Sequence, residues 1–380
     1  MNKVDRLYLI DIARAIAAIC VVLQHYQHFY YVRAEQSASH FYVDNFSRDQ
    51  QPFYNLIEPA YKFGAVAVQF FFVLSGYIFF MYYRKKIYEK SINFKNFIIL
   101  RLSRLYPLHL LTLLLMLFFQ KIYFYLTSEY FVYNGNNLRN FLLHFFLIQE
   151  WGFAKSLKGF NAPSWSISIE LLLYISFFLV SLIFIKNLFQ SLLALIIVFI
   201  LYLFTQASIG NITLGLVLFY LGGFTFYLFD FLKKKLNTKR NLIIFVLVII
   251  DIIVFGRFLN QIFLEWQMSL TDLIGSRLML LLFFVKFPLI ILNLSIIQHY
   301  FKNIGKSIQI FGDISYTIYL VHIPLEVIFA LVNKKIFSIN FDNNLIFLLY
   351  FASVFFFSII TYKYFELPLK NYLRKRLIFR

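Results

Sequence analysis

The sequence is poor in charged residues and almost lacks cysteine. Only 14% of its 380 residues are charged and 61% are hydrophobic, whereas a soluble domain carries about 25% charged residues. No globular core of this length could bury so much apolar surface, which excludes a soluble enzyme and a disordered protein. The single cysteine, Cys20, lies in an apolar segment and can form no internal disulfide. A disulfide scaffold is therefore excluded too, and the cysteine says nothing about the redox compartment.

Acidic residues are scarce relative to basic ones, with 18 Asp and Glu against 36 Lys and Arg and a net charge of +18. The basic residues stand in short runs between apolar stretches, such as 84–86, 233–235 and 374–376. This distribution is typical of the cytoplasmic loops of a membrane protein, which lie beside anionic lipid. Membrane lipids are therefore expected as partners, and nucleic acid is not.

Apolar segments long enough to cross a bilayer, which takes about 20 residues, recur along the chain. They lie near 8–31, 63–83, 104–126, 165–185, 191–208, 212–231, 241–256, 273–296, 313–332 and 345–362. The predicted fold class is all-α: a polytopic integral-membrane helix bundle with about ten transmembrane helices. With both termini in the cytoplasm, most Lys and Arg residues fall at cytoplasmic ends. No Pro- or Ser-rich linker and no internal repeat divides the chain, so residues 1–380 are expected to form a single domain.

Two apolar segments need a separate interpretation. Residues 140–149 are too few to span, so an interfacial or re-entrant element on the outer side is expected there. An eleventh span at 140–149 would also move the later basic runs outside, against the positive-inside bias. The N-terminal segment begins like a signal peptide, but no small-residue cleavage site follows it, so it is expected to be retained as the first span.

The first predicted span carries ionisable side chains, which are costly in lipid and usually face a cavity or a partner. Arg14 and His25 are eleven residues apart, which is about three helical turns and places them on one face. Asp11 lies one turn before Arg14 on nearly the same stripe. Taken singly, Arg14 could instead reach the inner headgroups beside Asp11, and His25 could be an interhelical hydrogen-bonding residue. His28, one turn further out, is expected to be interfacial.

Other polar residues stand in or beside the later spans. Arg101 and Arg104, one turn apart at the entrance of the third span, offer forked donors suited to phosphate oxygens. A membrane-edge anchor is the alternative for this pair. Glu170 enters the membrane about one turn into the fourth span, where stabilisation by the helix dipole is the alternative to a catalytic role.

The ninth predicted span holds a polar stripe. Ser315, Tyr319 and His322 fall on one face by their spacing, and Glu326 continues that face toward the outside. His322 would lie near the middle of the bilayer, where a solitary imidazole needs a partner. Polar packing between helices is the alternative explanation.

Taken together, these segments resemble the motifs of the acyltransferase 3 family of bacterial integral-membrane O-acyltransferases, in order and over most of the chain. The matching segments are 10–18 followed by His25, 71–77, 101–107, 165–170, 315–322 followed by Pro324, and 364–368. Each motif is weak alone, but six in order are specific. Two positions depart from the family pattern. Ile12 stands where a Gly is common, and Gln69 stands where an Asp often precedes the second motif, so an acidic role there is in doubt.

The resemblance implies an enzyme: an acyltransferase transferring groups other than aminoacyl groups, specifically an O-acetyltransferase. It would move an acyl group from cytoplasmic acyl-CoA (acetyl-CoA) to a hydroxyl of a cell-surface glycan or its lipid-linked precursor, in O-antigen, lipopolysaccharide, capsule or exopolysaccharide. The implied location is the bacterial cytoplasmic (inner) membrane. Acyl-CoA would be a substrate, with no permanently bound cofactor and no metal. No SGNH-type esterase domain is expected, which corresponds to the stand-alone kind of this family.

The site residues divide by role. His25 is the expected base for the acceptor hydroxyl, because imidazole titrates near neutrality. Glu170 would orient His25 or the sugar, and His322 would receive the acyl carbonyl or assist the leaving thiolate. The remaining assignments are Arg14, Arg101 and Arg104 for the anionic donor, Asp11, Ser168 and Tyr319 for support, and Ser75, Ser168 and Ser315 as conceivable acyl carriers.

Two other functions stay open from the sequence. A transporter or flippase of lipid-linked glycans would also place Arg, His and Glu in its spans. Such folds often show internal symmetry, which this chain lacks by inspection. The second alternative keeps the acyltransferase chemistry and acts on a lipid or a secondary metabolite. The acyl group, the acceptor sugar, direct transfer against an acyl-enzyme and the oligomeric state are not fixed by the sequence.

Overall fold

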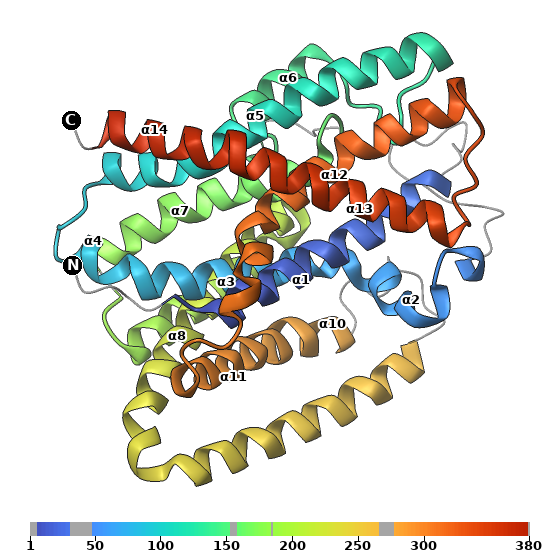
Figure 1. The fold of residues 1–380 in the computed structure, drawn as a ribbon. Helices are drawn as coiled ribbons and strands as arrows, with labels where there is room; N and C mark the ends of the chain where they lie inside the picture. The colour runs from blue at the N-terminus through green and yellow to red at the C-terminus, as the bar shows by residue number, and fades with distance from the viewer. Residues whose placement is uncertain (1–5, 31–47, 153–157, 184, 266–276, 379–380) are drawn as a thin grey trace. The chain divides into compact units, whose positions relative to one another are not determined.

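The computed structural model describes residues 6–30, 48–152, 158–183, 185–265 and 277–378. These residues form helices joined by short connections, with no strand among them, which confirms the all-α fold class (Figure 1). Nine helices in the described ranges are long and apolar enough to cross a membrane, so the chain is a multi-pass membrane protein. They are Tyr8–Tyr30, Tyr54–Tyr82, Phe94–Thr127, Ala162–Ile183, Leu188–Gln206, Ser208–Leu236, Met279–Tyr300, Lys306–Lys335 and Asn344–Leu377.

The seventh predicted span, 241–256, is also helical but is not one of these nine. It belongs to the last part of α8 (Leu188–Glu265), whose path bends at Ile209 and Lys239, where the backbone is not helical. Asp251 in this last part accepts a hydrogen bond from the Asn293 amide at 2.5 Å and lies 3.5 Å from the Lys286 ammonium. This pairing accounts for two charges in otherwise apolar segments. The count of ten spans and the cytoplasmic termini stay predictions.

The chain divides into two compact units, each assembled from three stretches. The first unit comprises Met1–Arg14, Val66–Asn93 and Leu173–Gly312, and the second comprises Ala15–Ala65, Phe94–Leu172 and Asp313–Arg380. The helices α1 (Tyr8–His25), α7 (Trp165–Ile183) and α12 (Gln309–Lys335) each contribute to both units. The expectation of a single domain over 1–380 stays a prediction.

In the first unit, α3 (Ala67–Tyr82) packs against the middle part of α8 through glycines. A Cβ atom on Gly76 would overlap the Phe219 carbonyl, and one on Gly222 would overlap the Val73 carbonyl. Small residues let helix backbones approach this closely in a membrane. The Gly of the 71–77 motif therefore has a packing role in this structure. The other elements of this unit are α4 (Arg84–Tyr88), α10 (Arg277–Leu281), η5 (Leu282–Lys286), α11 (Phe287–Tyr300) and η6 (Lys306–Ile308).

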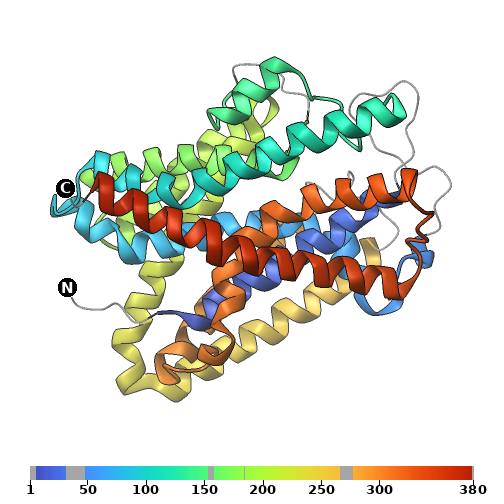
Figure 2. The same cartoon turned by 45° about the horizontal axis from the view of Figure 1, so that its top comes forward.

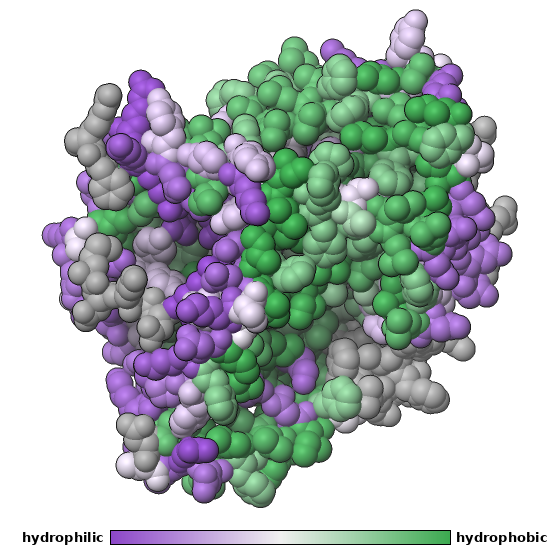
Figure 3. Space-filling model, viewed as in Figure 1, coloured by the Kyte–Doolittle hydropathy of each residue, from purple (hydrophilic) through white to green (hydrophobic). Residues whose placement is uncertain are grey.

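The second unit holds the histidines discussed below. Its elements are the second part of α1, η1 (Tyr26–Tyr30), η2 (Arg48–Gln50), α2 (Tyr54–Phe63), α5 (Phe94–Thr127), α6 (Leu138–Phe145), η4 (Ala162–Ser164), the start of α7, α12 (Gln309–Lys335), α13 (Asn344–Thr361), η7 (Tyr362–Glu366) and α14 (Leu367–Leu377). The basic helix α14 packs along the first turns of α5 (Figure 2). The apolar side chains of α13 lie on an exposed face that suits contact with lipid, whereas hydrophilic side chains gather over α14 (Figure 3).

The segment after α5 does not span. Its helix α6 has eight residues, a length of about 12 Å. The Gly135 amide donates to the Lys158 carbonyl at 2.9 Å, and the Phe160 amide donates to the Asn136 side chain at 2.7 Å. The two ends of this segment, residues 135–136 and 158–160, therefore lie side by side. An eleventh span at 140–149 is therefore excluded, and the position of this segment on the outer side stays a prediction.

Candidate active site

Two histidines from distant parts of the sequence form the centre of the candidate active site. His25 ends α1, and His322 lies in the middle of α12. The His25 Nδ1 atom is 2.8 Å from the His322 Nε2 atom, and the two rings are stacked with centroids 5.1 Å apart. His322 is fully buried, whereas His25 is partly exposed. The structure therefore brings these two predicted residues into contact, and their catalytic roles stay predictions.

The hydrogen bonds of His322 determine which nitrogen of His25 is available for chemistry. His322 Nδ1 lies 3.1 Å from the Ile318 carbonyl oxygen, which can only accept, so this nitrogen carries a hydrogen. In a neutral ring, His322 Nε2 is then the acceptor and His25 Nδ1 the donor. A neutral His25 consequently has its hydrogen on Nδ1 and a lone pair on Nε2. That lone pair is what a general base requires.

A buried glutamate side chain, that of Glu326, lies beside this pair. Its Oε2 atom is 2.7 Å from His28 Nδ1, and its Oε1 atom accepts from the Tyr350 hydroxyl at 3.3 Å. In its ionised form Glu326 accepts both bonds, and His28 Nε2 then accepts from the Tyr133 hydroxyl at 3.3 Å. His28 is only 4% exposed and stacks on His25 with ring centroids 4.7 Å apart. The ring of His28 is thus turned by η1 (Tyr26–Tyr30) into the protein interior, and the expectation that it lies at the depth of the membrane interface stays a prediction.

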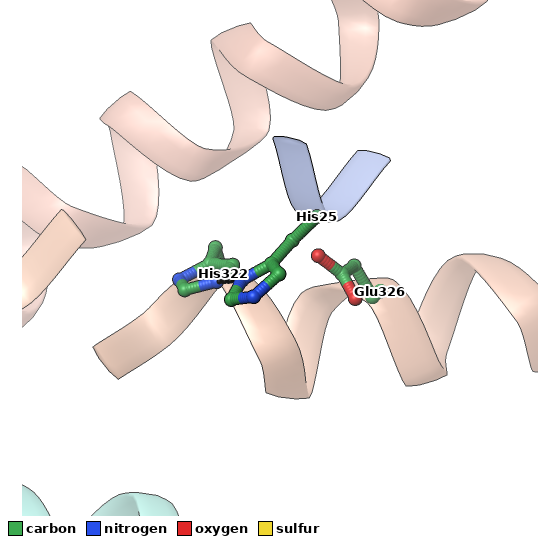
Figure 4. A group of neighbouring side chains, drawn as sticks. All are labelled: His25, His322 and Glu326. Atoms are coloured by element: carbon green, nitrogen blue, oxygen red, sulfur yellow. Dashed lines mark hydrogen bonds between the residues drawn. The ribbon is translucent and has the colours of Figure 1, made fainter. Parts of the chain in front are cut away.

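His25, His322 and Glu326 also have ligand types that hold metal ions, and their ligand atoms all lie within 4.8 Å of one another (Figure 4). Two imidazole nitrogens bound tetrahedrally to zinc at about 2.0–2.1 Å would lie roughly 3.3 Å apart. The observed separation of 2.8 Å is that of a hydrogen bond. The geometry therefore fits a proton-handling pair better than a metal centre.

A proline and an asparagine fix the helix that carries His322. Pro324 lies inside α12 and has no N–H, so the carbonyl four residues earlier, that of Leu320, loses its helical partner. The side-chain amide of Asn161 donates to this carbonyl at 2.9 Å. Asn161 is fully buried at the entrance to η4 and α7. This bond ties the start of α7 to α12 two residues before His322.

Three more predicted residues lie on these two helices: Ser168 and Glu170 on α7, and Tyr319 on α12. The Tyr319 hydroxyl donates to the Pro163 carbonyl at 2.7 Å and lies 2.9 Å from the Ser166 hydroxyl. Glu170 lies within electrostatic range of Tyr316 and Tyr319. Ser168 is fully buried and accepts a hydrogen bond from the Glu150 amide at 3.2 Å. Their catalytic or supporting roles stay predictions.

The predicted donor-binding arginines belong to both units. In the first unit, Arg14 pairs with Asp11 at 3.1 Å and donates to the Gly312 carbonyl at 2.7 Å. Asp11 also accepts from Arg6 at 2.7 Å, so it holds two guanidinium groups. In the second unit, Arg101 is 8% exposed and Arg104 is partly buried, one turn apart on α5.

Two further basic residues, Lys370 and Arg374, lie near Arg104. The sequence did not identify them as site residues. Arg374 on α14 donates to the Ser103 hydroxyl at 3.1 Å and to the Leu100 carbonyl at 3.0 Å. Lys370, one turn earlier, lies within electrostatic range of Arg104 and Arg374. We call Arg101, Arg104, Lys370 and Arg374 the basic cluster. From the sequence, the C-terminal basic residues were interpreted only as a signal for the cytoplasmic side of the membrane. No local pattern indicated that α14, which carries them, packs against α5.

Comparison with known proteins identifies the class. The family model described as an acyltransferase domain, that of acyltransferase 3, matches residues 7–363. The chain therefore belongs to the acyltransferase 3 family, as its motifs predicted.

Two curated relatives match shorter stretches. A protein of Rhizobium radiobacter, named protein 2 in the picA locus, is 34% identical over 112 residues, which are 30% of this chain and 44% of that protein. The acyltransferase MdmB of Streptomyces mycarofaciens is 30% identical over 141 residues, 37% of this chain and 34% of that protein. The chain thus spans less than half the length of these relatives. No solved structure matches it significantly.

Proposed function

We propose that this membrane acyltransferase is an O-acetyltransferase. It takes the acetyl group from acetyl-CoA on the cytoplasmic side and transfers it to a hydroxyl of a cell-surface glycan or its lipid-linked precursor, in the cytoplasmic membrane of a bacterium. The observation that carries the proposal is the His25–His322 hydrogen bond at 2.8 Å. It leaves the His25 Nε2 lone pair free to accept the proton of a hydroxyl nucleophile.

The proposed reaction is acid–base catalysis by one imidazole. The acceptor hydroxyl gives its proton to His25 Nε2 while its oxygen forms a bond to the thioester carbonyl carbon. When the tetrahedral intermediate collapses, the carbon–sulfur bond breaks and the departing thiolate takes the same proton from His25. The ester and free CoA are the products, and every proton is accounted for. His322 keeps the ring of His25 oriented throughout, because Nδ1 remains a donor in both charge states.

Glu326 supports the charged intermediate of this cycle. When His25 holds the proton, its imidazolium lies beside a carboxylate whose oxygens are already bonded to His28 and Tyr350. A preorganised charge of this kind stabilises the transition state without rearrangement. Glu326 is therefore proposed as a carboxylate that acts on His25 by its charge, in addition to the predicted role of Glu170 in orienting His25 or the sugar.

The basic cluster supports an anionic donor. Guanidinium groups bind phosphate oxygens through paired donors, and a lysine adds a point charge. Arg374 lies against α5 through two hydrogen bonds to its first turns, so α14 brings its charges to Arg104. The assignments of Arg14 to the donor and of Asp11 to a supporting role stay predictions from the sequence.

The experiment compares membranes that contain the wild-type chain with membranes that contain His25→Asn. The asparagine amide can replace Nδ1–H toward His322 but offers no base at the position of Nε2. Loss of a general base should lower O-acetyl transfer from radiolabelled acetyl-CoA to the glycan fraction by about 10²–10⁴-fold. His299→Asn, which changes a histidine of α11 in the first unit, is the matched control and should transfer normally.

Three results would contradict the proposal. Wild-type O-acetyl content in the glycan of His25→Asn cells, measured by NMR, would remove the base assignment. Glycan translocation that proceeds without any acyl donor would instead favour a flippase. Acetyl label that enters only lipid or small metabolites would move the acceptor to another class.

A further inference from the structure

One end of the first unit brings two basic side chains to the same aromatic ring. Arg84 is the first residue of α4, and its guanidinium carbon lies 5.6 Å from the centre of the Tyr88 ring. Lys186 follows α7, and its Nζ atom lies 4.6 Å from the centre of that ring. Lys186 is the main cause that lowers the pKa of the Tyr88 hydroxyl, and Arg84 adds to it. Two segments that are distant in the sequence therefore place two positive charges around one ring.

Among the residues that the structure describes, no carboxylate neutralises either of these two charges. The acidic residues of the adjoining elements have other partners: Glu89 pairs with Lys85 at 3.7 Å, and Asp230 pairs with Lys234 at 3.2 Å. Contact with an aromatic face stabilises a single cation, but two like charges at short distance repel each other. An anion bound to both side chains would remove this repulsion, so the arrangement favours an anionic ligand.

The guanidinium group of Arg84 is held with one edge free. Its Nε atom donates to the Ile185 carbonyl at 2.5 Å, and its carbon also lies 5.9 Å from the centre of the Tyr227 ring. These contacts fix the group while using one of its five N–H donors. In the part of the chain that the structure describes, the two terminal nitrogens have no partner, and neither is fully buried. Two parallel donors of this kind match two oxygens of a phosphate.

The surroundings of the two cations favour a lipid over a soluble anion. Arg84 lies two residues beyond the end of α3 and Lys186 three residues beyond the end of α7, and both helices belong to segments that can cross a membrane. Basic groups between the ends of such helices bind the head groups of anionic lipids. On the two sides of Lys186 in the sequence, Ile183 is 79% exposed and Phe189 is 74% exposed. These apolar side chains suit the acyl chains of the same lipid.

We propose that Arg84 and Lys186 form a binding site for the phosphate group of an anionic phospholipid. The terminal nitrogens of Arg84 donate to the two charged phosphate oxygens, and the Lys186 ammonium adds a point charge to one of them. Tyr88 and Tyr227 hold the cations in place through their rings. The site lies in the first unit and contains no residue of the candidate active site or the basic cluster. It therefore goes beyond the proposed function and does not depend on acetyl transfer.

The test uses the full chain in phosphatidylcholine nanodiscs that contain a small fraction of phosphatidylglycerol with a photoreactive acyl chain. After illumination, mass spectrometry measures the lipid attached to the peptides on either side of Lys186. Arg84→Gln should lower this crosslinking about tenfold, because paired charge-assisted hydrogen bonds to the phosphate are lost. Lys186→Gln changes an exposed side chain and should lower it about threefold. This second variant keeps the test valid if Arg84→Gln does not elute as a single folded species.

The matched control is Arg240→Gln. Arg240 is an exposed arginine of the same unit, and its guanidinium carbon lies 5.1 Å from the centre of the Tyr300 ring. The substitution therefore removes the same charge from beside a tyrosine, at a place outside the proposed site. Crosslinking beside Lys186 should equal that of the wild-type chain.

Four results would overturn the site. Wild-type crosslinking in both Arg84→Gln and Lys186→Gln would mean that these cations bind no lipid. Equal crosslinking by a photoreactive phosphatidylcholine would mean ordinary contact with the bilayer, without selection for an anion. An equal loss in Arg240→Gln would mean that net charge alone attracts the lipid. Loss of crosslinking on addition of coenzyme A would assign the phosphate contact to a soluble ligand.

Discussion

Replacing Glu326 by Gln tests the carboxylate beside the catalytic pair most directly. The change removes one charge and keeps the shape of a side chain that is fully buried. The introduced amide could still accept from Tyr350, and His28 could adopt its other tautomer, because the Tyr133 hydroxyl can accept as well as donate. The fold should therefore survive, and the loss should fall on catalysis.

The distances give the size of the effect. A Glu326 oxygen lies within 4.8 Å of a ring nitrogen of His25. At an effective dielectric constant of about 20, two unit charges at this distance attract each other by about 3 kcal/mol. The attraction exists only while His25 holds the acceptor proton, so its loss raises the barrier. We expect kcat to fall by roughly two orders of magnitude, with an unchanged KM for the donor.

The assay is steady-state transfer of radiolabelled acetyl from acetyl-CoA to the glycan in nanodiscs. Tyr350→Phe removes only one hydrogen bond from Glu326, worth about 1 kcal/mol, and should lower kcat by about fivefold. Glu58→Gln changes a carboxylate of α2 that pairs with Lys62 at 2.9 Å and should behave as wild type. If Glu326→Gln elutes normally and keeps kcat within threefold of wild type, the carboxylate does not stabilise the imidazolium, and the reasoning fails.

Three further predictions concern the supporting structure. Arg374→Gln should raise the KM for acetyl-CoA about tenfold without changing kcat, because a charge-assisted hydrogen bond is worth about 1.5–3 kcal/mol, and donor titrations measure this. Gly76→Val should lower the yield of monodisperse protein in gel filtration, because its side chain would meet the Phe219 carbonyl of α8. Asn161→Ala should lower the thermal midpoint, because the buried Leu320 carbonyl would lose its donor, at a cost of about 1–3 kcal/mol.

The parts of the site that the sequence predicted are those set by local periodicity or by motif. The apolar runs predicted nine helices that the structure contains, since about 20 apolar residues suffice to cross a bilayer. His25 and His322 were chosen because imidazoles in apolar spans need partners. The structure makes each the partner of the other, across 297 positions of sequence.

The parts that the sequence missed depend on contacts between distant segments. Glu326 and His28 are 298 positions apart, and Arg374 meets Ser103 across 271 positions. Helical spacing places Glu326 on the face of His322, but it cannot say which helix covers that face. His28 was expected at the membrane interface because it lies one turn further out than His25, and the sequence did not indicate that η1 would bury its ring.

The proline that follows His322 shows how a motif residue can act without touching substrate. Pro324 removes one N–H from the interior of α12, which leaves the Leu320 carbonyl to be bonded from outside the helix. Asn161 supplies that bond, at 2.9 Å. A Pro324→Ala variant would return an N–H to the Leu320 carbonyl and make the Asn161 bond redundant. The start of α7 would then be less firmly held, and the acceptor KM should rise more than the donor KM. Equal changes in both constants would indicate general loosening of α12 instead.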